Sequence, residues 1–481
     1  MKKSLMKKFA LLMSVLMILT SMAVCASAEE ATINPADWSY WDGLSVDVSP
    51  FEGKDPKVDY NPEAGHTAIV IETAAQLAGL SKVVNESGQG GGQKGAYRNW
   101  PIYITKNIDL DTYKFTPIGW GYNTAAFGGC MEGRLNGEEG KAVTIKNLWV
   151  SEGAKVYTPK GLEQIAAGAA KGESEAVNNA FIPTMRSGSL KNLTFENAKV
   201  GHPNSTGDVA VAVGYASKST TEISGVTVKN STVIAGFGAN VGGVVANLKN
   251  ENLSALTDVR AENVNIVVRV DEENGYGVEA NIGGVVGKWN AAAPLTLENC
   301  YYSGKILQLD TWTTIEADMP AGGFIGYYEG SKDLTIKKCE YAGDLAYAGE
   351  DREASISAFV GLYKPSGKIV IEDCRINGTP DALIGTEDAV DVTITNSTAA
   401  NDIAAVKGGA GHTVTGALTI DAPVEDPTEP PVVEDPTEPP VVEDPTEPPV
   451  DEPVDEPVEE VGFFQAIINA IIAFFKNLFG L

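Results

Sequence analysis

Short runs in which apolar and polar residues alternate recur along this chain at nearly constant spacing. Alternation at a period of two predicts a β-strand with one buried face. Asn, Gly and Ser separate the runs, and the intervals leave no room for the crossover helices that a βαβ sheet requires. The clearest runs are Leu295–Cys300, Leu334–Cys339 and Ile369–Cys374, and we align with them the runs Val226–Ser231, Val259–Val264 and Val392–Ser397.

This repeat predicts an all-β fold, a right-handed parallel β-helix in which each strand pairs with its equivalent one turn along. The cysteines that end the three clearest runs lie 39 and 35 residues apart, so the unit is constant and its loops vary. Equivalent side chains should stack about 4.8 Å apart. We expect the Gly-Gly pairs that precede the runs to lie at tight corners, where a Cβ would clash or φ must be positive. The alignment predicts one inward ladder of small side chains at Ala198, Ser231, Val264, Cys300, Cys339, Cys374 and Ser397.

Two glycine segments carry a family resemblance. Gly284–Gly287 (Gly-Val-Val-Gly) and Gly323–Gly326 (Gly-Phe-Ile-Gly) resemble the GLUG motif of bacterial surface proteins, which occurs in adhesins and beside some IgA-cleaving proteases. The resemblance covers residues 69–396 and departs at Ala246 and Ala358, where a motif glycine is missing. It implies an exported surface protein with a β-helix. An upstream block is also similar to the opening of such proteins, at Ile71–Leu80, Asn107–Asp111, Thr116–Gly119, Phe127–Gly129 and Ile145–Leu148.

The chain begins with the pattern of a secretory signal peptide. Residues 1–28 combine four lysines, an apolar run and Ala26-Ser-Ala28 as a cleavage site, so we expect removal on export. The predicted β-helix occupies residues 29–420. Within it, Thr73-Ala-Ala-Gln76 has the capping-box pattern and predicts a helix that covers the open end of the first coil. The apolar face of that helix consists of Leu77, Leu80, Val83 and Val84.

An insertion at Gly153–Ala180 interrupts the repeat. Its segment Pro159–Ala170 has helical apolar spacing, which indicates either a surface decoration or a lid over a binding face.

The composition changes abruptly after the predicted β-helix. Residues 421–461 repeat Glu-Asp-Pro-Thr-Glu-Pro-Pro, which cannot bury a core and predicts a disordered, semi-rigid stalk. Residues 462–481 are almost wholly apolar, and their few polar side chains fall on one side of a predicted helix. We expect this amphipathic helix to bind a membrane interface, another part of the cell envelope or copies of itself.

Charge and cysteine content narrow the classes of partner. Removing the +4 of residues 1–28, the sixteen acids of residues 421–461 and the +1 of Lys476 from the net charge of −28 leaves −17 for residues 29–420. A body this acidic argues against nucleic-acid partners, which need a basic surface. Cys300, Cys339 and Cys374 would stack too far apart for disulfides, so we expect reduced, buried thiols.

The sequence contains no motif that assigns catalytic, cofactor-binding or metal-ligating residues. Its histidines, His66, His202 and His412, stand alone in loop-like contexts, and no zinc-protease pattern surrounds them. Asp109 and Asp111 are the tightest acid pair in the sequence. The segment Asp271–Gly275 lacks the ligand spacing of a calcium-binding loop, so we interpret it as a solvated turn.

These features predict an exported, non-enzymatic, adhesin-like protein on the cell surface, without a cofactor. Its partners would be a host or environmental glycan or surface protein, and the cell envelope through residues 462–481. The alternative is a carbohydrate-active β-helix enzyme, a polysaccharide lyase or glycoside hydrolase, with two or three clustered acids on one face.

Overall fold

A computed structural model of the protein describes residues 45–89, 95–119, 125–150, 178–201, 207–217, 219–236, 239–250, 253, 255–270, 280–310, 321–330, 333–348, 356–364 and 367–420. The chain divides into two compact units, Met1–Pro423 and Val424–Leu481, and all described residues belong to the first. The predicted signal peptide, His202, the helix at Pro159–Ala170, the turn at Asp271–Gly275, the stalk and the C-terminal helix lie outside the described residues.

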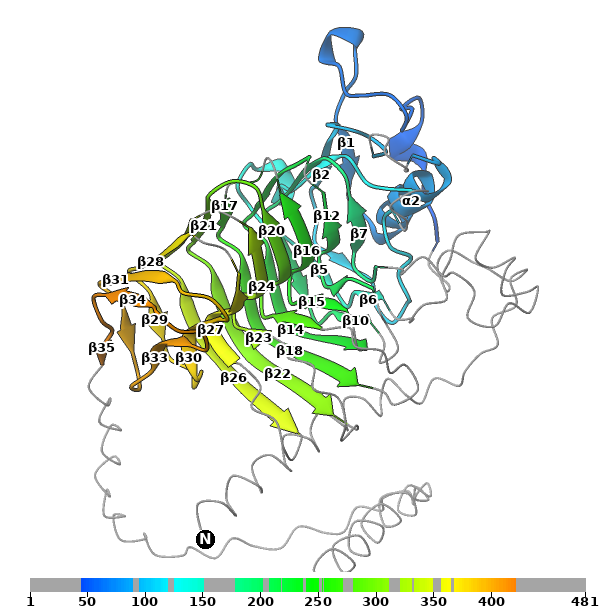
Figure 1. Ribbon diagram of the computed structural model, residues 1–481. Coiled ribbons are helices and arrows are strands. Elements are labelled where there is room, and N and C mark those ends of the chain that lie inside the picture. Colours follow the sequence, from blue (N-terminus) through cyan, green and yellow to red (C-terminus); the bar gives the residue numbers. More distant parts are fainter. Residues whose placement is uncertain are drawn as a thin grey trace, which may run out of the picture. The chain divides into compact units, whose positions relative to one another are not determined.

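Three long parallel sheets wind through the described residues and form a parallel β-helix (Figure 1). Sheet A consists, in order, of β1 (Ile69–Ile71), β2 (Pro101–Ile104), β4 (Cys130–Gly133), β8 (Gly188–Lys191), β13 (Thr220–Ser224), β17 (Ala255–Thr257), β21 (Leu295–Glu298), β25 (Leu334–Lys337), β28 (Lys368–Glu372), β31 (Asp391–Thr395) and β34 (Thr413–Thr415). Sheet C consists of β3 (Ile108–Asp109), β5 (Val143–Lys146), β9 (Leu193–Glu196), β14 (Thr227–Gly236), β18 (Arg260–Val270), β22 (Tyr301–Asp310), β26 (Glu340–Ala348), β29 (Arg375–Ile376), β32 (Thr398–Ala399) and β35 (Thr419–Ile420), with β6 (Trp149–Val150) and β10 (Lys199–Gly201) at its side.

Sheet B is interrupted in four of its coils, which contribute two short strands each, and in three of these a Gly-Gly pair lies at the break. Its members are β7 (Ile182–Met185), β11 (Val209–Ala210), β12 (Val213–Ala216), β15 (Asn240–Gly242), β16 (Val245–Asn250), β19 (Asn281–Gly283), β20 (Val286–Ala291), β23 (Ala321–Gly322), β24 (Ile325–Gly330), β27 (Ile356–Tyr363), β30 (Ala382–Thr386) and β33 (Ala404–Lys407). One coil therefore passes through sheet B, then sheet A, then sheet C. This order confirms the β-helix that the repeat predicts.

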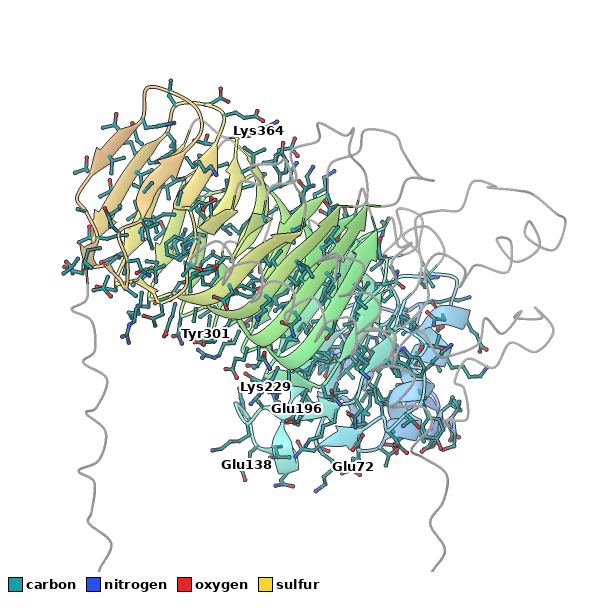
Figure 2. All side chains as sticks on the ribbon, turned by 90° about the horizontal axis from the view of Figure 1, so that it is seen from below. Glu72, Glu138, Glu196, Lys229, Tyr301 and Lys364 are labelled. Atoms are coloured by element: carbon teal, nitrogen blue, oxygen red, sulfur yellow. The ribbon has the colours of Figure 1, made fainter. Side chains whose placement is uncertain are left out.

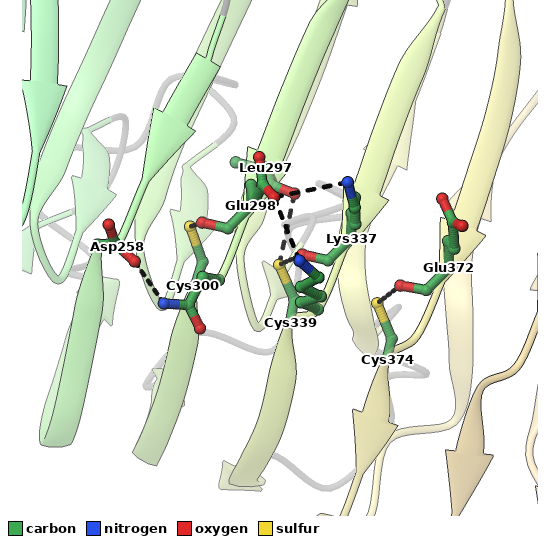
Figure 3. A network of polar contacts seen from close by, with 10 residues as sticks. Asp258, Leu297, Glu298, Cys300, Lys337, Cys339, Glu372 and Cys374 are labelled. Atoms are coloured by element: carbon green, nitrogen blue, oxygen red, sulfur yellow. Dashed lines mark hydrogen bonds and ion pairs between the residues drawn. The ribbon is translucent and has the colours of Figure 1, made fainter.

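The predicted cysteine ladder is confirmed in its last four coils. Tyr301 pairs with Glu340, Glu340 with Arg375, and Arg375 with Thr398, so the residues that precede them stack. The stacked side chains are Cys300, Cys339, Cys374 and Ser397, all buried. The three cysteines are free thiols, and Figure 3 shows them on consecutive turns, each close to a backbone carbonyl oxygen.

The prediction that Ala198, Ser231 and Val264 belong to the same ladder as the cysteines is wrong, because the strand register differs. Arg260 pairs with Tyr301, so Val259 and not Val264 precedes Cys300 in the stack. Val264 pairs instead with Ser231, in a separate ladder that also contains Ala198. The structural equivalent of Leu295–Cys300 is therefore Thr221–Val226, and Ala255–Val259 is the equivalent of Thr296–Cys300.

The residues directly before the stacked cysteines, not the paired glycines, adopt left-handed backbone, and before Cys339 that residue is Lys338, with φ 53°. Asn299 has φ 54° and directly precedes Cys300, and Asp373 has φ 53° and precedes Cys374. Asn and Asp tolerate this backbone region better than most residues. Gly284 lies outside the left-handed region, but a Cβ on it would collide with the carbonyl oxygen of Gly323 and with the ring of Tyr302. The prediction that a Cβ would clash at the Gly-Gly pairs is therefore confirmed, whereas the alternative reason, a positive φ, is wrong.

A single described α-helix, α2 (Ala74–Glu86), packs at the first coil, as the capping box predicts (Figure 1). The Thr73 hydroxyl oxygen accepts the Gln76 N–H at 3.2 Å. Leu77, Leu80 and Val84 are buried in the common core, whereas Val83 is partly buried. The 3-10 helices η2 (Ser49–Phe51), η3 (Pro62–Ala64) and η4 (Leu135–Gly137) complete the described helical turns. Among the described residues, no helix is long and apolar enough to cross a membrane.

Candidate functional site

A row of polar and aromatic side chains faces outward from sheet B. Strand register aligns Tyr215 of β12, Asn247 of β16, Lys288 of β20 and Tyr327 of β24. The row faces outward because the residues that follow it in each strand form an inward, buried row, consisting of Ala216, Leu248, Trp289 and Tyr328. Each outward member is half-buried, so its polar end reaches the surface while its stem packs on the sheet.

Lys288 is the centre of contacts in this row. Its Nζ atom lies 3.0 Å from Oε2 of Glu329 and 4.8 Å from the centre of the Tyr327 ring. Lys364 approaches the same ring at 5.6 Å, and its Nζ atom lies 3.3 Å from Oε2 of Glu387. Figure 2 shows Lys364 on a different side of the β-helix from Glu196, Lys229 and Tyr301, which lie on sheet C. The ammonium groups are thus held in place over an aromatic ring by neighbouring carboxylates.

A ladder of amides lies on the adjoining strands of the same sheet. Asn240 pairs with Asn281, and Asp208 and Asn178 occupy the equivalent position in the two preceding coils. Asn281 donates through Nδ2 to Oδ1 of Asn240 at 2.8 Å, and Asn240 donates to Oδ1 of Asp208 at 2.6 Å. Asn247 adds a bond to Oδ2 of Asp208 at 3.2 Å. The amide hydrogen bonds therefore point along the ladder and converge on one carboxylate.

Asp208 titrates unusually high for an aspartate. Burial beside these amides raises its pKa to about 6, because desolvation disfavours the carboxylate. Hydrogen bonds from Asn240 and Asn247 and the charge of Lys288 pull the pKa back down, but they do not outweigh the burial. The influence of Lys288 on Asp208 joins the ladder to the outward row. We call the combined set the sheet B surface: Asp208, Tyr215, Asn240, Asn247, Asn281, Lys288, Tyr327 and Glu329.

This arrangement offers hydrogen-bond donors, acceptors and an aromatic ring side by side. Amides, ammonium groups and carboxylates recognise hydroxyl-rich ligands, and aromatic rings pack against their apolar faces. Among the described residues, no group of His, Cys, Asp and Glu side chains could hold a metal ion.

The residues that the sequence singled out have local structural roles. His66 stacks on Trp100, with ring centres 4.6 Å apart, and its Nδ1 accepts the Asn61 N–H at 3.0 Å. His412 contacts its own glycine loop, with 2.7 Å between Nε2 and the Gly408 oxygen.

The predicted acid pair is also structural. Asp109 accepts the N–H of Asp111 at 2.8 Å and the side-chain amide of Asn147 at 2.7 Å, which closes a turn. Among the described residues, no contact joins His66, His412 or this acid pair to the sheet B surface.

Sequence reasoning missed the sheet B surface, although a signal exists. Asn240 and Asn281 each stand two residues before a Gly-Gly pair, and Asp208 precedes the equivalent Val-Ala segment. This polar position repeats with the glycine corner, so an alignment on the glycines would have placed the ladder.

Comparisons with known proteins add little to this geometry. No protein-family description matches the chain, and no curated protein matches it. Similarity is found to the crystal structure of a candidate immunoglobulin A1 protease from Bacteroides ovatus, with a TM-score of 0.45 and 18% sequence identity over 73% of this chain and 84% of that one. A likeness of this size assigns no activity, and the fold rests on the strand pairing described above.

Proposed function

We propose that this protein is an exported, adhesin-like surface protein that binds glycans through the sheet B surface and carries out no catalysis. The resemblance of Gly284–Gly287 and Gly323–Gly326 to the GLUG motif supports the class of protein, and the signal-peptide pattern supports export. The observation that carries the proposal is the convergence of amides, Lys288 and Tyr327 on one outward face of sheet B.

The energetics of this surface favour recognition of a sugar. A hydroxyl group can bridge the Lys288 ammonium and the Asn247 amide, which come from neighbouring strands. Hydrogen bonds to charged groups contribute about 1.5–3 kcal/mol each, so two or three would give measurable affinity. The side chains are already held by their neighbours, and a preorganised site loses less entropy on binding.

A glycan array with the full mature chain tests this proposal. Lys288→Ala and Tyr327→Ala should each weaken binding by about tenfold or more, because each removes a direct contact. Matched controls lie on sheet A: Lys337→Ala, whose Nζ atom is 3.6 Å from Glu298, and Tyr103→Ala, whose ring lies 3.9 Å from the Arg134 guanidinium. The controls should bind like the wild-type protein. Equal losses in both pairs, or binding unaffected by the sheet B variants, would refute the assignment of this surface.

One observation favours the enzyme alternative. The pKa of Asp208 is about 6, and the charge of Lys288 lowers it from a still higher value. Lys288 also forms an ion pair with Glu329, so two carboxylates flank one ammonium group. Perturbed carboxyl groups are common at catalytic sites. If the protein is a polysaccharide lyase or hydrolase, Asp208→Asn should abolish release of sugar fragments and leave glycan binding nearly unchanged. Failure of the wild-type protein to release fragments from any bound glycan would reject this alternative.

A further inference from the structure

The final coil of the β-helix has free strand edges. Its strands are β33, β34 and β35, and among the described residues each of them pairs on one side only, with β30, β31 and β32 of the preceding coil (Figure 1). A free edge presents unpaired N–H and C=O groups and is a template for another strand.

The inward positions of this coil are open to solvent. Val414 aligns with the buried Val392 but is itself 44% exposed, and Ile420 aligns with the buried Ala399 but is 48% exposed. The opposite end differs, because Ile69 and Ile71 of β1 are fully buried in one core with Leu77 and Leu80 of α2. The described β-helix is therefore closed at its first coil and open at its last.

The strand edges of the open end carry little charge, which permits a second copy of the chain to pair with them. The three strands of the last coil contain one charged residue, Lys407, whose Nζ atom already lies 3.1 Å from Oδ2 of Asp381. Natural edges that avoid self-pairing usually carry charges or proline, and these strands carry neither at Thr413–Thr415 or Thr419–Ile420. The net charge of −17 over residues 29–420 and the acidic stretch that begins at Asp421 oppose close approach of two copies, so pairing costs least at a strand edge that has little charge of its own.

We infer that the last coil is a self-association surface, through which two copies of this chain meet end to end. Under a two-fold axis that crosses the end at β34, β34 of one copy pairs with β34 of the other in antiparallel orientation, β33 of each copy meets β35 of the other, and Val414 and Ile420 of each copy become buried. Because α2 covers the other end, association stops at a dimer. The dimer would carry two sheet B surfaces, which would raise avidity for a multivalent ligand. The inference does not depend on what that surface binds.

Light scattering and sedimentation of the full mature chain test this inference over about 1–200 µM, a range that covers micromolar dissociation constants. The wild-type protein should form a dimer, and Val414→Lys should weaken dimerisation by about tenfold or more, because it buries an unpaired charge at the interface. Val70→Lys is the matched control, since Val70 is also 44% exposed but faces outward from β1. It should dimerise like the wild-type protein.

Two outcomes overturn the inference. One is a wild-type protein that stays monomeric throughout this range. The other is association that is unchanged in Val414→Lys but lost after deletion of residues 462–481, which would assign self-association to that apolar segment.

Two cysteine variants supply an independent test of the end-to-end arrangement. Thr415→Cys should form an intermolecular disulfide on mild oxidation, whereas Thr335→Cys, in the same row of sheet A but in an inner coil, should not. Equal cross-linking of the two variants would contradict the end-to-end arrangement.

Discussion

At the scale of residues, the stacked cysteines behave as small hydrophobic side chains. Cys300, Cys339 and Cys374 are buried, and each sulfur lies near backbone carbonyl oxygens, such as the 3.3 Å from Cys339 Sγ to the Lys337 oxygen. Burial raises the pKa of Cys339 well above its ordinary value, and the neighbouring Cys339 thiol together with burial raises the pKa of Cys374. The thiols of Cys339 and Cys374 therefore stay protonated, and the stacked cysteines contribute volume to the fold and not reactivity.

Substitution of Cys339 tests this interpretation. Cys339→Val keeps an apolar side chain of similar size, so its free energy of unfolding should stay within about 1.5 kcal/mol of wild type. Cys339→Asp places a lone carboxylate in the ladder and should cost several kcal/mol, enough to unfold neighbouring coils. Circular dichroism during thermal unfolding measures both. A Cys339→Asp protein as stable as wild type would mean that this ladder faces water.

Asp208 predicts a pH dependence of stability. Its pKa is raised to about 6 in the folded protein, so between about pH 4 and pH 6 the folded state holds a proton that the unfolded chain has lost. The contribution of this group to stability is therefore greatest at low pH and falls as pH rises through 6. Between about pH 4 and pH 7, wild type should lose about 1–3 kcal/mol relative to Asp208→Asn, because the neutral amide does not titrate.

Urea unfolding at a series of pH values measures this difference. Asp391→Asn, which changes an exposed carboxylate on sheet A, is the control and should leave the pH profile of wild type unchanged. Parallel profiles for wild type and Asp208→Asn would show that Asp208 titrates normally.

At the scale of elements, the sequence predicts the kind of each strand better than its register. Val259–Val264 and Leu295–Cys300 share the same alternation, and each ends in asparagine followed by a buried residue. Yet the first run begins sheet C, whereas the second lies on sheet A. Asn263 and Asn299 both adopt left-handed backbone, so two different corners have the same local pattern. Only the pairing across coils separates them.

The capping helix was predictable because its signals are local. Thr73, Gln76 and the apolar spacing that follows lie within one stretch of chain. The amide ladder requires an alignment of whole coils, because Asp208 meets Asn240 and Asn247, which lie 32 and 39 residues further along the chain in the next coil. Within one coil, asparagines near glycines are typical of turns, so the local sequence does not distinguish a turn from an outward row.

The Gly-Gly corner supplies a prediction for this scale. Gly284→Ala should destabilise the protein by about 1–3 kcal/mol, since the new Cβ must displace Tyr302 or the Gly323 backbone. The third repeat already has Ala358 at this corner, and there the equivalent of Tyr341 is Ile376. The double variant Gly284→Ala, Tyr302→Ile should therefore recover part of the loss, which denaturant unfolding can measure. No recovery would place the clash in the backbone alone.

At the scale of the whole molecule, the chain joins an acidic β-helix to a Pro-rich acidic stretch and an apolar C-terminal segment. The β-helix follows from the structure, whereas the roles of residues 421–461 and 462–481 stay predictions from sequence. These two neighbouring segments have opposite affinities for a membrane surface. The acidic residues repel an anionic surface, while burial of each Phe, Ile or Leu side chain contributes about 1.5–3 kcal/mol.

This contrast predicts where the protein resides. The apolar residues of the segment 462–481 offer more burial than reversible membrane binding needs, even after about 1–2 kcal/mol per residue is subtracted for ordering the backbone. Truncation after Val461 should therefore leave the β-helix folded, by circular dichroism, and move the protein from the cell envelope into the medium, by fractionation and blotting. The Val414→Lys variant, with its C-terminal segment intact, should stay in the envelope and so separates anchoring from end-to-end pairing. Equal partition of the full-length and truncated proteins would reject the anchor, because the apolar segment would then contribute nothing to retention in the envelope.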